Sequence, residues 1–149
     1  MSLQLLAVRT ARYFATGPRA TLLLSQWVTT IMIMIHCGLA MALGFASLDR
    51  FVSDSFSPLM DLTGQKPWLA AVIYVTSAAL MALPFKWINV AGNWLGMMAN
   101  IVFAGMFGVA MVNSPTAAST AFPVYAGLAA ICAALLTARV IEKPLPLAE

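Results

Sequence analysis

His36 is the only histidine among the 149 residues, and it lies in the middle of an apolar segment at 22–45. A protonatable side chain buried at the centre of a membrane-spanning helix is costly, which makes this residue a candidate functional group. The simpler interpretation, which we favour, is a neutral imidazole that hydrogen-bonds to a hydroxyl or amide of another helix. Haem ligation would usually need a second axial ligand, and nothing in the sequence selects one of the ten methionines for that role.

Small and amide side chains recur on one face of the apolar segment at 88–112. Every fourth residue is Gly, Ala or Asn, in the series Gly92, Gly96, Asn100, Ala104 and Gly108. On a helical projection, Asn89 and Asn93 fall within ~40° of Asn100, beside that series. Small residues allow two helices to approach closely, and amides in lipid need partners. We favour a helix-packing interface closed by amide hydrogen bonds; the alternatives are an oligomer interface or the wall of a pore.

Charged side chains are absent from the centres of the apolar segments, which contain no Asp, Glu, Lys or Arg. Ion-coupled transporters usually carry such a residue, and an intramembrane hydrolase needs an acid–base or metal constellation. We therefore expect no catalytic residues, no metal site and no cofactor.

Two other sets of residues have a chemical and a structural interpretation. Cys37 and Cys132 lie in apolar segments without a C-x-x-C pattern, and we expect small packing residues rather than a redox pair. Asp49, Asp54 and Asp61 share one loop, where solvated acids are a better interpretation than a cation site.

The composition indicates a membrane protein, because 62% of the residues are hydrophobic and only 9% are charged. Soluble domains carry about 25% charged residues, and a soluble fold of this length could not bury so much apolar surface. The net charge of +3 comes from basic residues beside apolar segments, without interleaved aromatics. That placement favours contact with lipid headgroups and gives no support for nucleic-acid binding.

The apolar segments predict an all-α protein, an integral membrane four-helix bundle made of two transmembrane hairpins in a single domain at 1–149. We expect spans at about 22–45, 68–84, 88–112 and 121–140. A short amphipathic helix at 3–16 is expected to lie in the membrane interface, and the loop at 46–67 is expected to hold a second interfacial element. The fourth span repeats small residues, which predicts that it packs on the third span through Ala126, Ala130, Ala134 and Ala138.

The basic residues predict the orientation of these spans. Six of the eight lie on one side of the predicted membrane, and the other side holds only Arg50 and Lys66. The excess of Lys and Arg on the cytoplasmic side of membrane proteins places both termini in the cytoplasm. We expect the inner (cytoplasmic) membrane, with the mitochondrial inner membrane or a virion as alternatives.

Two segments carry a resemblance to a known group of proteins. Residues 53–60 (SDSFSPLM) lead into Trp68 of a span, and residues 113–125 (NSPTAASTAFPVY) open the last one. Over about residues 50–139 the chain resembles small multi-span membrane proteins of tailed bacteriophages, many of them holin-like. The resemblance implies a pore-forming protein without catalytic residues, and no site residue is implied by it.

The expected function is therefore non-enzymatic and depends on helix association, in a holin-like or pore-forming homo-oligomer. The alternative is a structural subunit of a larger membrane complex, respiratory or virion-associated. A third interpretation is a one-electron or quinone-site protein built around His36.

Overall fold

The computed structural model describes residues 18–45, 47, 51, 53–83, 85–114 and 120–141, with side chains omitted at 18–23 and 141. Every described element is a helix. The elements are α2 (Pro18–Phe45), α3 (Ser57–Leu62), α4 (Trp68–Ala82), α5 (Lys86–Asn113) and α6 (Ala121–Ile141). The interfacial helix predicted at 3–16 lies outside the described residues.

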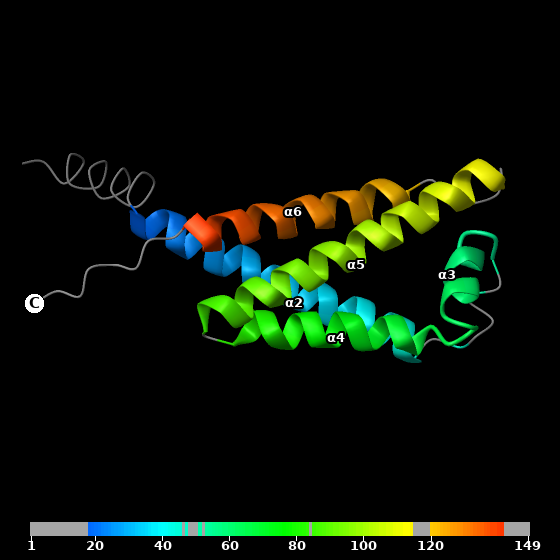
Figure 1. Cartoon of the computed structure of the whole chain (residues 1–149), viewed down its shortest axis with the longest axis horizontal. Helices are drawn as coiled ribbons and strands as arrows, with labels where there is room; N and C mark the ends of the chain where they lie inside the picture. Colours follow the sequence, from blue (N-terminus) through cyan, green and yellow to red (C-terminus); the bar gives the residue numbers. More distant parts are fainter. Residues whose placement is uncertain are drawn as a thin grey trace, which may run out of the picture.

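The four long helices pack mainly on their neighbours in the chain. Most contacts between the long helices join α2 to α4, α4 to α5 and α5 to α6, whereas α2 and α6 touch at few positions. The first residues of α2 and the last residues of α6 lie at the same end of the molecule, at the left in Figure 1. The described part of the chain therefore runs the length of the bundle an even number of times.

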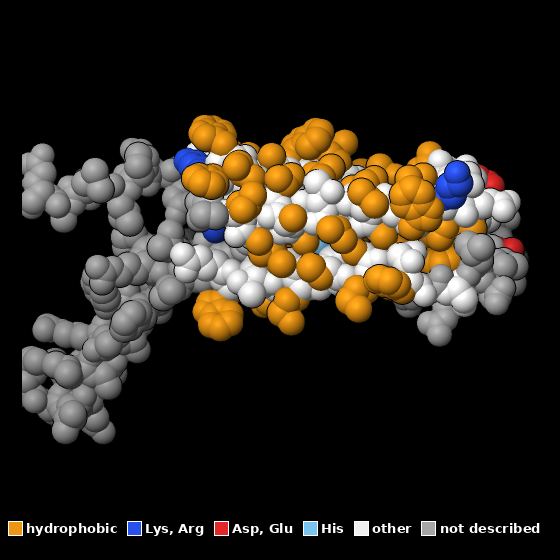
Figure 2. Space-filling view, turned by 90° about the horizontal axis from the view of Figure 1, so that it is seen from below, with side chains coloured by type: hydrophobic (Ala, Val, Ile, Leu, Met, Phe, Trp, Pro, Cys, Tyr) orange, Lys and Arg blue, Asp and Glu red, His pale blue; other side chains and the backbone are white. Residues whose placement is uncertain are grey.

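Three helices are long and apolar enough to cross a membrane, namely Leu24–Phe45, Lys86–Asn113 and Ala121–Val140. The fourth expected span, α4, has only 15 residues. At ~1.5 Å per residue it is about 22 Å long, which is shorter than the ~30 Å hydrocarbon layer. On the face shown in Figure 2, hydrophobic side chains are spread along the middle of the molecule, and Lys and Arg lie near its two ends.

The helix boundaries differ from the expected ones where the chain turns. The spans expected at 68–84 and 88–112 leave a connection at 85–87, which is shorter in the structure because α5 already begins at Lys86. The loop at 46–67 contains a short helix, α3, whose first turn includes Pro58. Proline is tolerated in a first helical turn, where the backbone N–H has no intrahelical partner. Gly64 and Gln65 form a turn after α3, with φ angles of 58° and 62°.

Aromatic rings hold the segment around α3 against the longer helices. Phe56 contacts Phe107 of α5 edge to face at 5.5 Å, and Phe107 stacks on Tyr125 of α6 at 5.4 Å. At the same end, the Ser114 hydroxyl donates a hydrogen bond of 2.7 Å to the Asp54 carboxylate. These contacts connect the 53–62 segment to the α5–α6 end of the bundle.

The prediction for the small residues of α6 was wrong about the face, although α6 does pack on α5. Ala130, Ala134 and Ala138 are exposed and Ala126 is half-buried. The buried residues of this helix are Ala129, Cys132 and Leu135. Only 17% of the most apolar stretch of α6 is buried, against 39% in α5, so α6 lies at the periphery.

Candidate functional site

The core of the bundle contains a network of polar side chains centred on Asn100 of α5, which is fully buried. Its Oδ1 accepts a hydrogen bond of 3.0 Å from the Tyr74 hydroxyl of α4. Its Nδ2 lies 3.3 Å from Nε2 of His36 on α2 and 4.0 Å from the Cys132 sulfur on α6. One amide therefore contacts side chains of the three other long helices.

Only one assignment of donors and acceptors fits the hydrogen bonds around His36. The Ser77 hydroxyl donates its only proton to the Gly92 carbonyl at 2.9 Å, so its oxygen must accept from Nδ1 of His36 at 3.1 Å. Nδ1 therefore carries the proton, and Nε2 is the acceptor for the Asn100 amide. This assignment follows from the donors and acceptors present. It describes a neutral imidazole whose two nitrogens are both satisfied.

Asn89 and Asn93 form a second polar group nearer the start of α5. The Asn89 amide donates to the Met81 carbonyl at 2.5 Å, which satisfies a backbone oxygen at the end of α4. Asn93 donates to the backbone and side-chain oxygens of Asn89 at 2.9 and 3.0 Å. Its own Oδ1 is buried without a hydrogen-bond partner among the described residues. Both asparagines therefore face protein, and Asn89 joins α5 to α4.

Two glycines of the α5 series allow the close approach that this network needs. A Cβ on Gly92 would lie 2.6 Å from the Met81 backbone nitrogen, and a Cβ on Gly96 would overlap the His36 ring and lie 2.8 Å from the Ser77 hydroxyl. Further along the helix, Ala104 is buried, and Gly108 lies against the Phe122 ring of α6. The whole series thus faces other helices of the same chain.

The structure also shows residues that the sequence analysis did not single out. Tyr74 and Ser77 are fully buried in α4, and the Tyr74 ring lies 5.2 Å from the His36 ring. The same argument that selected His36, a polar group in an apolar helix, would have pointed to Ser77. Cys132 is buried and Cys37 is exposed, and both thiols are free.

The chemistry of this site is that of a hydrogen-bonded core. The described residues contain no group of three His, Cys, Asp or Glu side chains that would hold a metal ion. Each contact in the network joins neutral donors and acceptors of two different helices, apart from the Asn89–Asn93 pair. The arrangement fixes the positions of α2, α4 and α5 relative to one another.

Comparisons with protein-family models, with curated proteins and with solved structures find no match to this chain.

Proposed function

We propose that this chain is a non-enzymatic integral membrane protein that acts by helix association. In this proposal the chain is a transmembrane four-helix bundle that forms holin-like pores by self-association. The supporting observation is the set of buried polar side chains that lie within an apolar shell. They are Thr29, His36, Ser77, Asn89, Asn93 and Asn100 of the long helices.

Polar groups inside a membrane are retained where they face protein or water. In the closed chain the amides of α5 face α2 and α4 through the Asn100 and Asn89 contacts. If the helices of several chains rearranged around a common axis, the same amides would face a water-filled lumen. Water molecules would then replace the hydrogen-bond partners that the amides lose inside the chain. The amide face of α5 is therefore compatible both with the closed single chain and with a pore.

The pore is tested by producing the full chain in bacteria and following the membrane potential and lysis. We expect the potential to collapse at high expression, with an empty vector as the control for induction. A chain that accumulates in the membrane and leaves the potential unchanged would rule out the pore.

In the proposed orientation the chain lies in the inner membrane with both termini on its cytoplasmic side. The Lys and Arg distribution supports it. Fusions of green fluorescent protein and of alkaline phosphatase after Glu149 give the measurement, since the first is fluorescent only in the cytoplasm and the second active only outside it. We expect fluorescence and no phosphatase activity. Active phosphatase would show that the C-terminus lies outside the cytoplasm and would contradict the proposed orientation.

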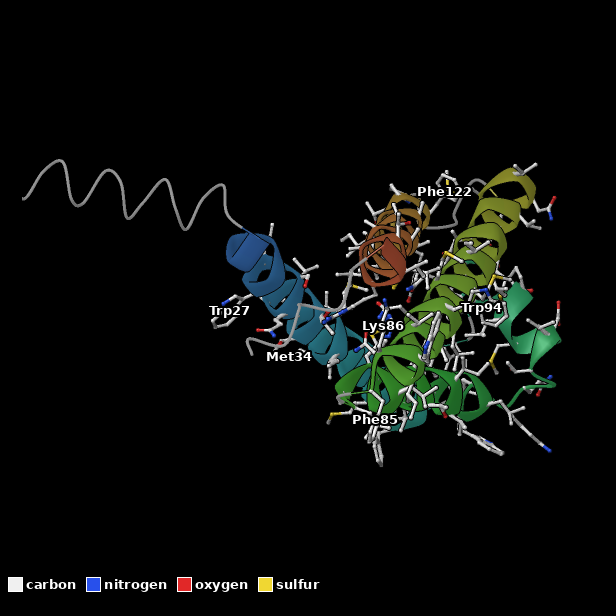
Figure 3. All side chains as sticks on the ribbon, turned by 60° about the vertical axis from the view of Figure 1, so that its left-hand side comes forward. Trp27, Met34, Phe85, Lys86, Trp94 and Phe122 are labelled. Carbon is white, nitrogen blue, oxygen red and sulfur yellow. The ribbon has the colours of Figure 1, made fainter. Side chains whose placement is uncertain are left out.

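The second candidate is a structural subunit of a larger membrane complex. The peripheral position of α6 favours it, because an exposed spanning helix offers a surface for an unrelated chain. Trp27 and Met34 likewise point away from the other helices (Figure 3), with exposed fractions of 67% and 68%. Purification in mild detergent distinguishes the two: a stoichiometric complex with other chains supports the subunit, and a homo-oligomer supports the pore.

A further inference from the structure

A second ring proton on His36 would have no acceptor in the closed core while Asn100 keeps its orientation. Both ring nitrogens of an imidazolium are donors, and Nε2 lies 3.3 Å from the Nδ2 of Asn100, which is also a donor. Turning the Asn100 amide over would offer Oδ1 to the ring. The amide nitrogen would then donate to the Tyr74 oxygen, and the Tyr74 hydroxyl proton would lose the acceptor that it now has at 3.0 Å. A charged His36 therefore leaves one donor without a partner in either orientation of the amide.

The helices packed around His36 offer no charge to balance an imidazolium. α4 presents Tyr74 and Ser77, α5 presents Asn100 and Gly96, and α6 presents Cys132 behind the amide. The titratable groups among these are the phenol and the thiol. No Asp, Glu, Lys or Arg occurs among the buried residues of the part of the chain that the structure describes. An unpaired charge at this depth is strongly unfavourable.

We propose that His36 couples opening of the bundle to the uptake of a proton. The closed form holds a neutral imidazole, whereas a form in which water reaches His36 takes up a proton below about pH 6.5. Because the open form binds more protons, acidification favours opening. The inference rests on the proposed function, since it requires an open form, and it names the group that regulates the change.

The size of the effect follows from linkage. If the closed form stays neutral, lowering the pH from 7.5 to 5.5 multiplies the ratio of open to closed chains by about ten for each His36 that becomes exposed. A pore built from several chains responds more steeply. His36→Gln keeps an amide able to donate and accept but does not titrate, so its pH dependence is expected to disappear.

The first measurement is dye release from vesicles containing the full chain, at pH 7.5 and 5.5. We expect the release rate to rise about tenfold or more at pH 5.5 for the wild type and to stay constant for His36→Gln. Asp61→Asn removes an exposed carboxylate of α3 and is expected to keep the wild-type response. A wild-type rate that does not change with pH, or a response that survives in His36→Gln, would overturn the coupling while leaving the pore intact.

The second measurement separates the coupling from the pore. With one histidine in the chain, ¹⁵N-histidine labelling gives an imidazole spectrum from His36 alone. We expect the closed bundle, held as a monomer in mild detergent, to keep the neutral Nδ1–H form at pH 5.5, and we expect an imidazolium at that pH once the bundle is opened with SDS. An imidazolium in the closed monomer overturns the coupling. An absence of dye release at both pH values counts against the proposed pore, and the ¹⁵N spectrum then decides the coupling.

Discussion

Gly92→Ala is expected to destabilise the packing of α4 on α5 by about 1–3 kcal/mol or more. The added Cβ would lie 2.6 Å from the Met81 nitrogen and 2.9 Å from the Leu80 carbonyl carbon. Both are backbone atoms of the last turn of α4, and they cannot move aside as a side chain can. The measurement is the SDS-induced unfolding of the protein in mixed micelles, followed by circular dichroism.

Gly105→Ala on the same helix is the matched control. A Cβ at this position meets nothing within 4 Å, so the substitution changes helix propensity without adding a contact. Alanine is favoured over glycine in a helix by up to about 1 kcal/mol, and the variant is expected to be as stable as the wild type or slightly more so. Equal unfolding midpoints for the two variants would contradict the close approach of α4 and α5.

Asn100→Ala is the second substitution with a large expected effect, a destabilisation of about 2–4 kcal/mol. It removes the acceptor of the Tyr74 hydroxyl and the donor to His36 Nε2, and it leaves both groups buried without a partner. Asn113→Ala is the control, because this asparagine is exposed at the end of α5. Its effect is expected to stay within about 0.5 kcal/mol.

A double-mutant cycle isolates the Tyr74–Asn100 hydrogen bond. Tyr74→Phe keeps the ring contacts with His36 and Phe103 and removes only the hydroxyl. Measured hydrogen bonds between transmembrane helices average about 0.6 kcal/mol, with a maximum near 1.7. The coupling energy between Tyr74→Phe and Asn100→Ala is expected in that range. A coupling energy of zero would show that the two side chains do not interact.

The sequence allowed the helical class and the approximate positions of the long apolar segments to be predicted. Long apolar runs are strongly constrained by lipid, and Gly64-Gln65 is a local turn signal. The ends of α4 and α5 were less predictable. Phe85, Lys86 and Trp87 combine a charge with aromatic residues, which fits a turn or a first helical turn equally well.

The faces of the helices could be predicted for α5 but not for α6. Glycine and asparagine together mark a packing face, because the backbone approach and the amide partners both require it. In α6 nearly every face carries alanine, so a repeat of four residues selects no particular side. The partners of His36 could not be predicted either, since Tyr74 and Ser77 of α4 meet it only through the packing of α2 on α4.

Contact between His36 and Asn100 within one chain is the central claim of this account. It is tested by dipolar coupling between ¹⁵Nε2 of the only histidine and the ¹³Cγ of asparagine in membrane samples. We compare chains that carry both labels, diluted in unlabelled chains, with an equal mixture of chains that carry one label each. The account predicts coupling in the diluted doubly labelled chains and none in the mixture. Coupling in the mixture, or in neither sample, would contradict it.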